Sequence, residues 1–152
     1  MTSSEPRPAF RPTIAVDFDG CIHSYEKGWA AGEIYGTVVP GFFEWLFDAA
    51  TRFDVVIHSS RATKPSHIAA MHAWLDKHYQ AWRGLQQDLV RYPGHLKLPI
   101  VAEKPPAWLT IDDRSFRFDG HWDELALTVP ELLAFKPWMS RSKQRGGGEG
   151  TA

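Results

Sequence analysis

Residues 13–20 read TIAVDFDG, an apolar run that ends abruptly in two aspartates and a glycine. The run Thr13–Val16 is short and rich in β-branched residues, which is typical of a strand buried within a sheet. Carboxylates that interrupt a buried segment are costly unless they are paired or hydrogen-bonded. Asp17 and Asp19 are therefore the first candidates for a functional site, in preference to a solvated turn.

Segments with the patterns of strands and helices alternate along the rest of the chain. Apolar runs predict further strands at 53–58, 96–101 and 107–111. Apolar residues at helical spacing, with proline near each start, predict helices from Pro40-Gly41 to Ala50, from Pro65 to Trp82 and from Val129 to Phe135. This alternation predicts an α/β fold with a mostly parallel central sheet.

The composition predicts one globular domain in a chain of 152 residues. We expect a flexible lead at 1–12, the folded domain at 13–139 and a disordered, basic, Gly-rich tail at 140–152. The formal net charge of -1 argues against binding to DNA or a membrane by bulk electrostatics. The single cysteine, Cys21, excludes an internal disulfide and fits a reducing compartment. Without a signal peptide or an apolar span, a soluble cytoplasmic protein is expected.

Polar clusters follow three of the apolar runs. Ser59-Ser60-Arg61 follows the second run and Asp112-Asp113-Arg114 the fourth, while Lys104 precedes the fourth run. In an open parallel sheet, ligands bind beyond the carboxyl ends of the strands, so these groups should converge on one edge. Several carboxylates in one pocket repel each other unless a cation compensates them. A hard divalent cation with oxygen ligands, best Mg²⁺, is the expected remedy, together with Lys104.

The order of these motifs resembles that of the haloacid dehalogenase-like superfamily of phosphohydrolases. Asp17-x-Asp19-Gly20 resembles its first motif, Ser59 its second, Lys104 its third and Asp112-Asp113 its fourth. The segment 104–118 is similar to one in small phosphatase-like members from phages and bacteria, and the resemblance covers 13 to about 120. Cys21 departs from the family pattern, which usually has threonine there. The resemblance implies a Rossmann-like three-layer α/β/α sandwich without a large cap domain.

The resemblance also implies a role for each motif residue. Asp17 is expected to be the nucleophile that forms an aspartyl phosphate, and Asp19 the general acid and base. Magnesium ligands are then Asp17, the backbone carbonyl of Asp19 and Asp112, with Asp113 as a further ligand or an orienting group. Phosphate would be held by Ser59 and Lys104, with Ser60 as a rival for Ser59, Lys97 as a rival for Lys104, and Arg61 as a further candidate. Arg61 and Arg114 are equally well explained as ion-pair partners of the acidic cluster, and His23 as a loop residue.

Only a short flap, residues 21–39, follows the first motif, so no separate cap domain fits. Unless a second subunit covers it, the site should therefore be open to a bulky phosphorylated substrate: a nucleotide, a nucleic-acid end or a phosphoprotein. Nucleic acid is expected only as a substrate. Two alternatives lack turnover: a phosphoacceptor signalling domain, whose motif order differs, and a module that only binds phosphate and magnesium.

Overall fold

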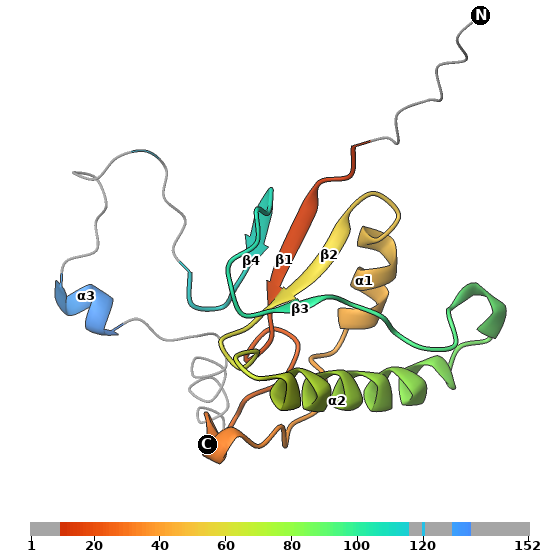
Figure 1. Ribbon diagram of the computed structural model, residues 1–152, viewed down its shortest axis with the longest axis horizontal. Helices are drawn as coiled ribbons and strands as arrows, with labels where there is room; N and C mark the ends of the chain where they lie inside the picture. Colours follow the sequence, from red (N-terminus) through yellow and green to blue (C-terminus); the bar gives the residue numbers. More distant parts are fainter. Residues whose placement is uncertain (1–9, 116–119, 121–128, 135–152) are drawn as a thin grey trace, which may run out of the picture.

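The computed structural model describes residues 10–115, 120 and 129–134 of the chain. The strands are β1 (Thr13–Asp17), β2 (Asp54–His58), β3 (Ile100–Val101) and β4 (Leu109–Ile111). The helices are α1 (Phe42–Ala49), α2 (Pro65–Arg83) and α3 (Val129–Ala134), with short 3-10 turns η1 (Ala30–Gly32) and η2 (Leu89–Arg91). The order of strands and helices (Figure 1) confirms a mixed α/β fold.

The four strands form one parallel sheet in the order β3-β2-β1-β4. The register pairs Asp17 with His58 and Val16 with Ile111 across β1, and His58 with Val101 across β2. The carboxyl ends of all four strands therefore lie along the same edge of the sheet. This placement confirms that the residues following β1, β2 and β4 converge there.

The hydrophobic core lies between the sheet and two helices. Alternate residues of β1 and β2 share one face of the sheet, and these strands pack in one cluster with α1 and α2. The cluster includes Ile14, Val16, Val55, Ile57, Phe43, Leu46, Met71, Leu75 and Tyr79. The rings of Phe43 on α1 and Tyr79 on α2 lie 5.6 Å apart, so the two helices also contact each other. Hence α1 and α2 cover the same face of the sheet.

The three-layer arrangement remains a prediction, because among the described residues α1 and α2 account for one covering layer.

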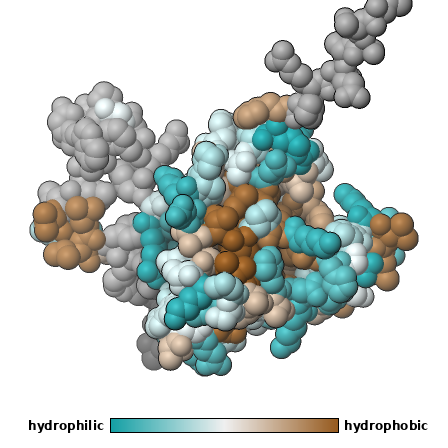
Figure 2. All heavy atoms as spheres, in the orientation of Figure 1, coloured by the Kyte–Doolittle hydropathy of each residue, from teal (hydrophilic) through white to brown (hydrophobic). Residues whose placement is uncertain are grey.

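Figure 2 shows hydrophobic residues gathered over the middle of the view, surrounded by hydrophilic ones. Within the described part of the chain, no helix combines the length and apolar character needed to cross a membrane. The predicted tail at 140–152 and Phe135 lie outside the described residues, as do residues 1–9 of the predicted lead.

The strand predicted at 96–101 is too long, since β3 contains only Ile100 and Val101. The segment before β3 contacts α2 instead: the Leu96 N–H donates a hydrogen bond to the Asp76 carboxylate of α2 at 3.4 Å. Pro99 has no N–H to offer a sheet, although its carbonyl accepts a hydrogen bond from the Ile57 N–H at 2.8 Å. The apolar run that predicted a strand here reflects packing of Leu96 and Leu98 against the core.

Candidate functional site

Two carboxylates and a thiol meet at the carboxyl edge of the sheet. Asp17 ends the central strand β1, Cys21 lies in the loop after it, and Asp113 follows β4. One ligand atom from each of these three side chains lies within 4.8 Å of the other two. Gly20 makes this approach possible, because its φ is +90° and a Cβ on it would lie 2.5 Å from Oδ2 of Asp113.

The electrostatics of this acidic cluster favour a bound cation. Burial, together with the charges of Asp112, Asp113 and Asp19, raises the pKa of Asp17 from 3.8 to about 7. Burial also raises the pKa of Asp113. Its Oδ1 is buried and has no hydrogen-bond partner among the described residues. A cation between Asp17 and Asp113 would remove the repulsion and supply the missing partner.

Cys21 contributes to this cluster as a thiol. Burial raises its pKa to about 12, and the charge of Asp17 is the next cause. Without a metal ion, the side chain therefore stays protonated at neutral pH. The structure places the sulfur of Cys21 within 4.8 Å of a carboxylate oxygen of Asp17 and one of Asp113, a contact that the sequence does not indicate.

Asp112 acts on Asp17 mainly through its charge. Because Ile111 pairs with Val16, Asp112 comes level with Asp17 at the end of the neighbouring strand. Among the neighbouring carboxylates, Asp112 has the largest effect on the pKa of Asp17, ahead of Asp113. Its Oδ1 accepts a hydrogen bond from the Arg114 N–H at 2.8 Å, which fixes the turn after β4. The structure therefore places Asp113 in the cluster with Asp17 and Cys21, and Asp112 at the same edge of the sheet, where it acts on Asp17 through its charge.

Asp19 is held by two side chains that come from different parts of the chain. Nδ1 of His23 lies 2.8 Å from Oδ1 of Asp19, and Nε of Arg61 donates to Oδ2 at 2.6 Å. The Gly36 N–H donates to Nε2 of His23 at 2.9 Å, so in the neutral ring Nδ1 carries the hydrogen and donates to Asp19. Both oxygens of Asp19 thus accept hydrogen bonds, and its carboxylate is fixed in orientation.

The predicted phosphate ligands differ in their surroundings. Ser59 directly follows β2, is 2% exposed, and its Oγ accepts the Arg61 N–H at 3.2 Å. Ser60 is exposed. Lys104 is also exposed and makes no hydrogen bond or ion pair with the acidic cluster among the residues the structure describes. The structure therefore places Ser59 at the edge of the sheet where phosphate binding is proposed. That Lys104 binds phosphate stays a prediction.

Two residues of this site are closer to Asp19 than the sequence indicates. His23 is predicted as a loop residue, and its ring is completely buried against Asp19. Arg61 is predicted as either an ion-pair partner or a substrate ligand, and it forms an ion pair with Asp19. The spacing of four residues between Asp19 and His23 is a local signal for their contact. The pair of Arg61 and Asp19 spans 42 residues and has no such signal.

Comparison with known proteins gives no relative. No family model, curated protein or solved structure matches this chain. The functional assignment therefore depends on the geometry of the site and on the sequence motifs.

Proposed function

We propose that this protein is a magnesium-dependent phosphatase that hydrolyses phosphate monoesters through an aspartyl phosphate on Asp17. One observation carries the proposal: Asp17 ends the central strand beside Asp112 and Asp113, and its pKa is raised to about 7. A destabilised carboxylate at the ligand-binding edge of a parallel sheet is typical of a functional site. The motif order supports a haloacid dehalogenase-like fold, completed as a three-layer sandwich. Cys21 as a free thiol suits a cytoplasmic location.

The residues present fit magnesium. Mg²⁺ takes hard oxygen ligands and commonly binds through one or two carboxylates, keeping water and phosphate oxygens in its other positions. Asp17 and Asp113 offer such oxygens within the cluster, and Asp112 and the carbonyl of Asp19 are further candidates. When bound, the ion would neutralise the carboxylates and the phosphate oxygens as charge moves between them.

The residues of the chain then divide the reaction between them. Asp17 attacks phosphorus to form an acyl phosphate, and the bond to the leaving oxygen breaks. Asp19 gives a proton to that oxygen and later takes one from the water that hydrolyses the acyl phosphate. His23 and Arg61 hold Asp19 in place through both of its oxygens. Ser59 and Lys104 are proposed to hold the phosphoryl oxygens.

The proposed roles of Asp17 and Asp19 are tested by replacing each with asparagine. Acid-quenched intact mass after mixing with an activated aryl phosphate should show no adduct on Asp17→Asn, because an amide oxygen is a poor nucleophile. Asp19→Asn should still form the adduct from an aryl phosphate, then stall. General acid–base help is worth about 10²–10⁴-fold, so Asp19→Asn should lose far more activity on alkyl than on aryl phosphates in the first step.

A contrary result has a definite meaning for each variant. An adduct on Asp17→Asn would remove the nucleophile assignment, and equal losses on both substrates would remove the acid role of Asp19. Unchanged turnover in both variants would overturn the phosphatase proposal. The alternatives are a phosphoacceptor signalling domain and a module that binds phosphate and magnesium without turnover. Steady phosphate release by the wild-type protein, with magnesium and not with EDTA, separates the enzyme from both.

A further inference from the structure

Arg114 carries a positive charge beside the proposed active site that no carboxylate neutralises in an ion pair. It directly follows Asp113, and its backbone N–H donates to Oδ1 of Asp112 at 2.8 Å. Its side chain is exposed and makes no hydrogen bond or ion pair with the residues that the structure describes. Burial raises the pKa of Asp113, and the charge of Arg114 is the next cause and lowers it, so this charge acts on the acidic cluster.

The ring of Tyr25 shows where the Arg114 guanidinium lies. The guanidinium carbon is 5.7 Å from the centre of this ring, within the range of a cation–π contact. The same ring centre lies 5.9 Å from the guanidinium carbon of Arg61 and 5.8 Å from the centre of the His23 ring. Tyr25 has a φ of 55°, which is unfavourable for a bulky residue, and strain of this kind is typical of functional sites. Because Arg61 and His23 both bind Asp19, Arg114 lies on the Asp19 side of the acidic cluster.

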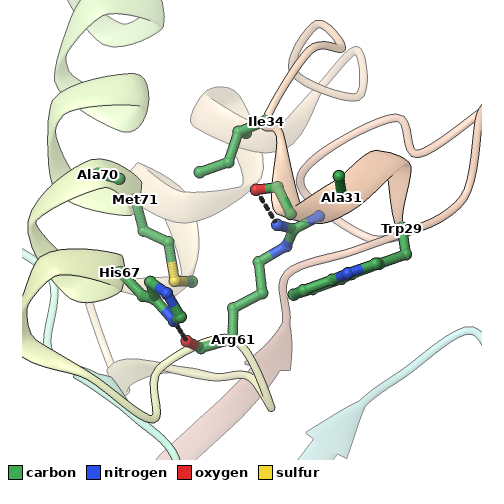
Figure 3. Close-up of a pocket in the computed structure, with 8 residues that line it drawn as sticks. Trp29, Ala31, Ile34, Arg61, His67, Ala70 and Met71 are labelled. Atoms are coloured by element: carbon green, nitrogen blue, oxygen red, sulfur yellow. Dashed lines mark hydrogen bonds between the residues drawn. The ribbon is translucent and has the colours of Figure 1, made fainter.

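Arg61 lies on the same side, but its charge is already neutralised. The residue is 4% exposed, its Nε donates to Asp19 at 2.6 Å, and its Nη1 donates to the Gly32 carbonyl of the flap at 2.8 Å. Figure 3 shows the Arg61 side chain reaching the flap beside Trp29, and its guanidinium carbon lies 4.6 Å from the centre of that ring. Arg61 therefore binds Asp19 and the flap, whereas Arg114 is available to an anion from solvent.

The position of Arg114 corresponds to the leaving group of the substrate. Asp19 is proposed to give its proton to the leaving oxygen, so the rest of the leaving group extends past Asp19. The transferring phosphoryl group would instead lie on the metal, where Ser59 and Lys104 are proposed to hold it. An arginine on the Asp19 side is therefore placed to contact the part of the substrate that departs.

The chemistry of the Arg114 side chain restricts what that part contains. The planar guanidinium presents paired N–H groups that match two oxygens of a phosphate. The carboxylates at this edge of the sheet repel any anion that no cation meets, so a charged leaving group needs a positive partner here. Because the side chain is exposed, the attraction is modest and salt weakens it.

We propose that Arg114 binds a second phosphate, carried by the leaving group of the substrate. The substrate is then a phosphate monoester whose leaving group contains either another phosphomonoester, as in a small bisphosphate, or the phosphodiester next to a phosphorylated nucleic-acid end. This inference rests on the proposed phosphatase function and names the substrate class of the same site.

The test measures phosphate release, with magnesium present, from two pairs of substrates that differ in the second phosphate charge. One pair is 1,4-butanediol bisphosphate and 4-hydroxybutyl phosphate. The other is a 5′-phosphorylated thymidine dinucleotide and the same dinucleotide with a neutral methylphosphonate linkage. In at least one pair, the member with the second charge should have a kcat/KM at least about fivefold higher, and salt should reduce this preference.

The two pairs distinguish the two sources of the second phosphate. A preference confined to the dinucleotide pair supports the inference and indicates a nucleic-acid end. A preference confined to the butanediol pair supports it and indicates a small bisphosphate. No preference in either pair would overturn the inference.

A matched pair of variants assigns the preference to Arg114. Arg91 is also exposed, and its guanidinium carbon lies 5.8 Å from the centre of the Tyr92 ring, but it belongs to η2, which follows the far end of α2 (Figure 1). Arg114→Gln should lower kcat/KM for the member with the second charge at least about fivefold more than for its partner. Arg91→Gln should keep the preference, and Arg114→Lys should keep part of it because the charge remains.

Two results with Arg114→Gln would overturn the inference. If the variant keeps the preference, the second phosphate is bound elsewhere. If it lowers kcat/KM equally for both members of each pair, Arg114 binds the transferring phosphoryl group instead.

A binding measurement separates this inference from the proposed function. Calorimetry with calcium in place of magnesium, which should prevent turnover, compares the members of each pair as ligands. The member with the second charge should bind more tightly to the wild type and to Arg91→Gln, but not to Arg114→Gln. If this pattern is found while no phosphate ester is hydrolysed in magnesium, the phosphatase proposal fails and Arg114 stands as a phosphate ligand. If an aryl phosphate is hydrolysed while the members of each pair bind equally, the assignment of Arg114 fails and the phosphatase proposal stands.

Discussion

Replacing Asp17 with asparagine should stabilise the metal-free protein above neutral pH, although it removes the proposed nucleophile. In the folded protein burial, together with the charges of Asp112, Asp113 and Asp19, raises the pKa of Asp17 from 3.8 to about 7. In the unfolded chain this carboxyl keeps its ordinary pKa, so the unfolded state loses its proton first as the pH rises. The stability that protonated Asp17 allows is therefore complete below pH 3.8 and is lost as the pH rises through about 7.

The size of this effect follows from the two pKa values. Each unit of pKa is worth about 1.36 kcal/mol, so the wild-type protein should lose about 4 kcal/mol of unfolding free energy by pH 8. At pH 5 the same reasoning gives a loss of about 1.6 kcal/mol. Solvent screening makes both figures upper limits, because Asp17 is partly exposed. Asparagine does not ionise, so Asp17→Asn should lack this dependence on pH.

The assay is urea unfolding in EDTA at pH 5 and pH 8. The gain in unfolding free energy of Asp17→Asn over the wild type should be about 2 kcal/mol larger at pH 8 than at pH 5. Asp88→Asn is the control, because Asp88 is exposed and lies outside the acidic cluster. A gain that is the same at both pH values would refute the reasoning. Magnesium at pH 8 should stabilise the wild type and not Asp17→Asn, which links the same carboxylate to the metal.

Further predictions concern the metal and its surroundings. Gly20→Ala and Gly41→Ala should each lower the unfolding free energy in urea by about 1–3 kcal/mol, since both glycines have φ near +90°. Only Gly20→Ala should also weaken magnesium binding, because its Cβ would displace Asp113. Equal magnesium affinity in the two variants would contradict this role of Gly20. Asp113→Ala should raise the magnesium concentration needed for half-maximal activity more than Asp112→Ala does, because Asp113 shares the cluster with Asp17 whereas Asp112 acts on Asp17 through its charge. The opposite order would make Asp112 the direct ligand. Calcium added to the magnesium-loaded protein should inhibit phosphate release, because calcium takes more oxygen ligands than magnesium and would bind both oxygens of Asp17. Undiminished phosphate release in calcium would count against Asp17 as a direct metal ligand.

The strands that carry the site were predictable because their burial leaves a local pattern. Thr13–Val16 and 53–58 are short apolar runs between polar segments, and both correspond to strands within a residue of the predicted ends. The parallel arrangement follows from the helices between them, since a chain that crosses over a sheet returns in the same direction. Hence the convergence of Asp17, Ser59 and Asp112-Asp113 on one edge was also predictable.

The strand predicted at 96–101 was too long, because an apolar run indicates burial of side chains but not the hydrogen-bond partners of the backbone. Leu96 and Leu98 are partly buried, as the run indicates, but the Leu96 N–H bonds to the Asp76 side chain of α2. Strand formation needs a neighbouring backbone in register, and only Ile100 and Val101 have one in β2. The length of β3 was therefore decided by tertiary contacts.

The sequence by itself determined the alternation of strands and helices, the strand ends that carry polar residues, and the residue types available for chemistry. It could do so because hydrophobic periodicity is local and a parallel sheet has one ligand-binding edge. Only the tertiary structure decided that Arg61 pairs with Asp19, that His23 is buried against the same carboxylate, and that Cys21 lies with Asp17 and Asp113. Side-chain contacts and pKa shifts of this kind depend on distances across the fold, which the order of residues along the chain does not specify.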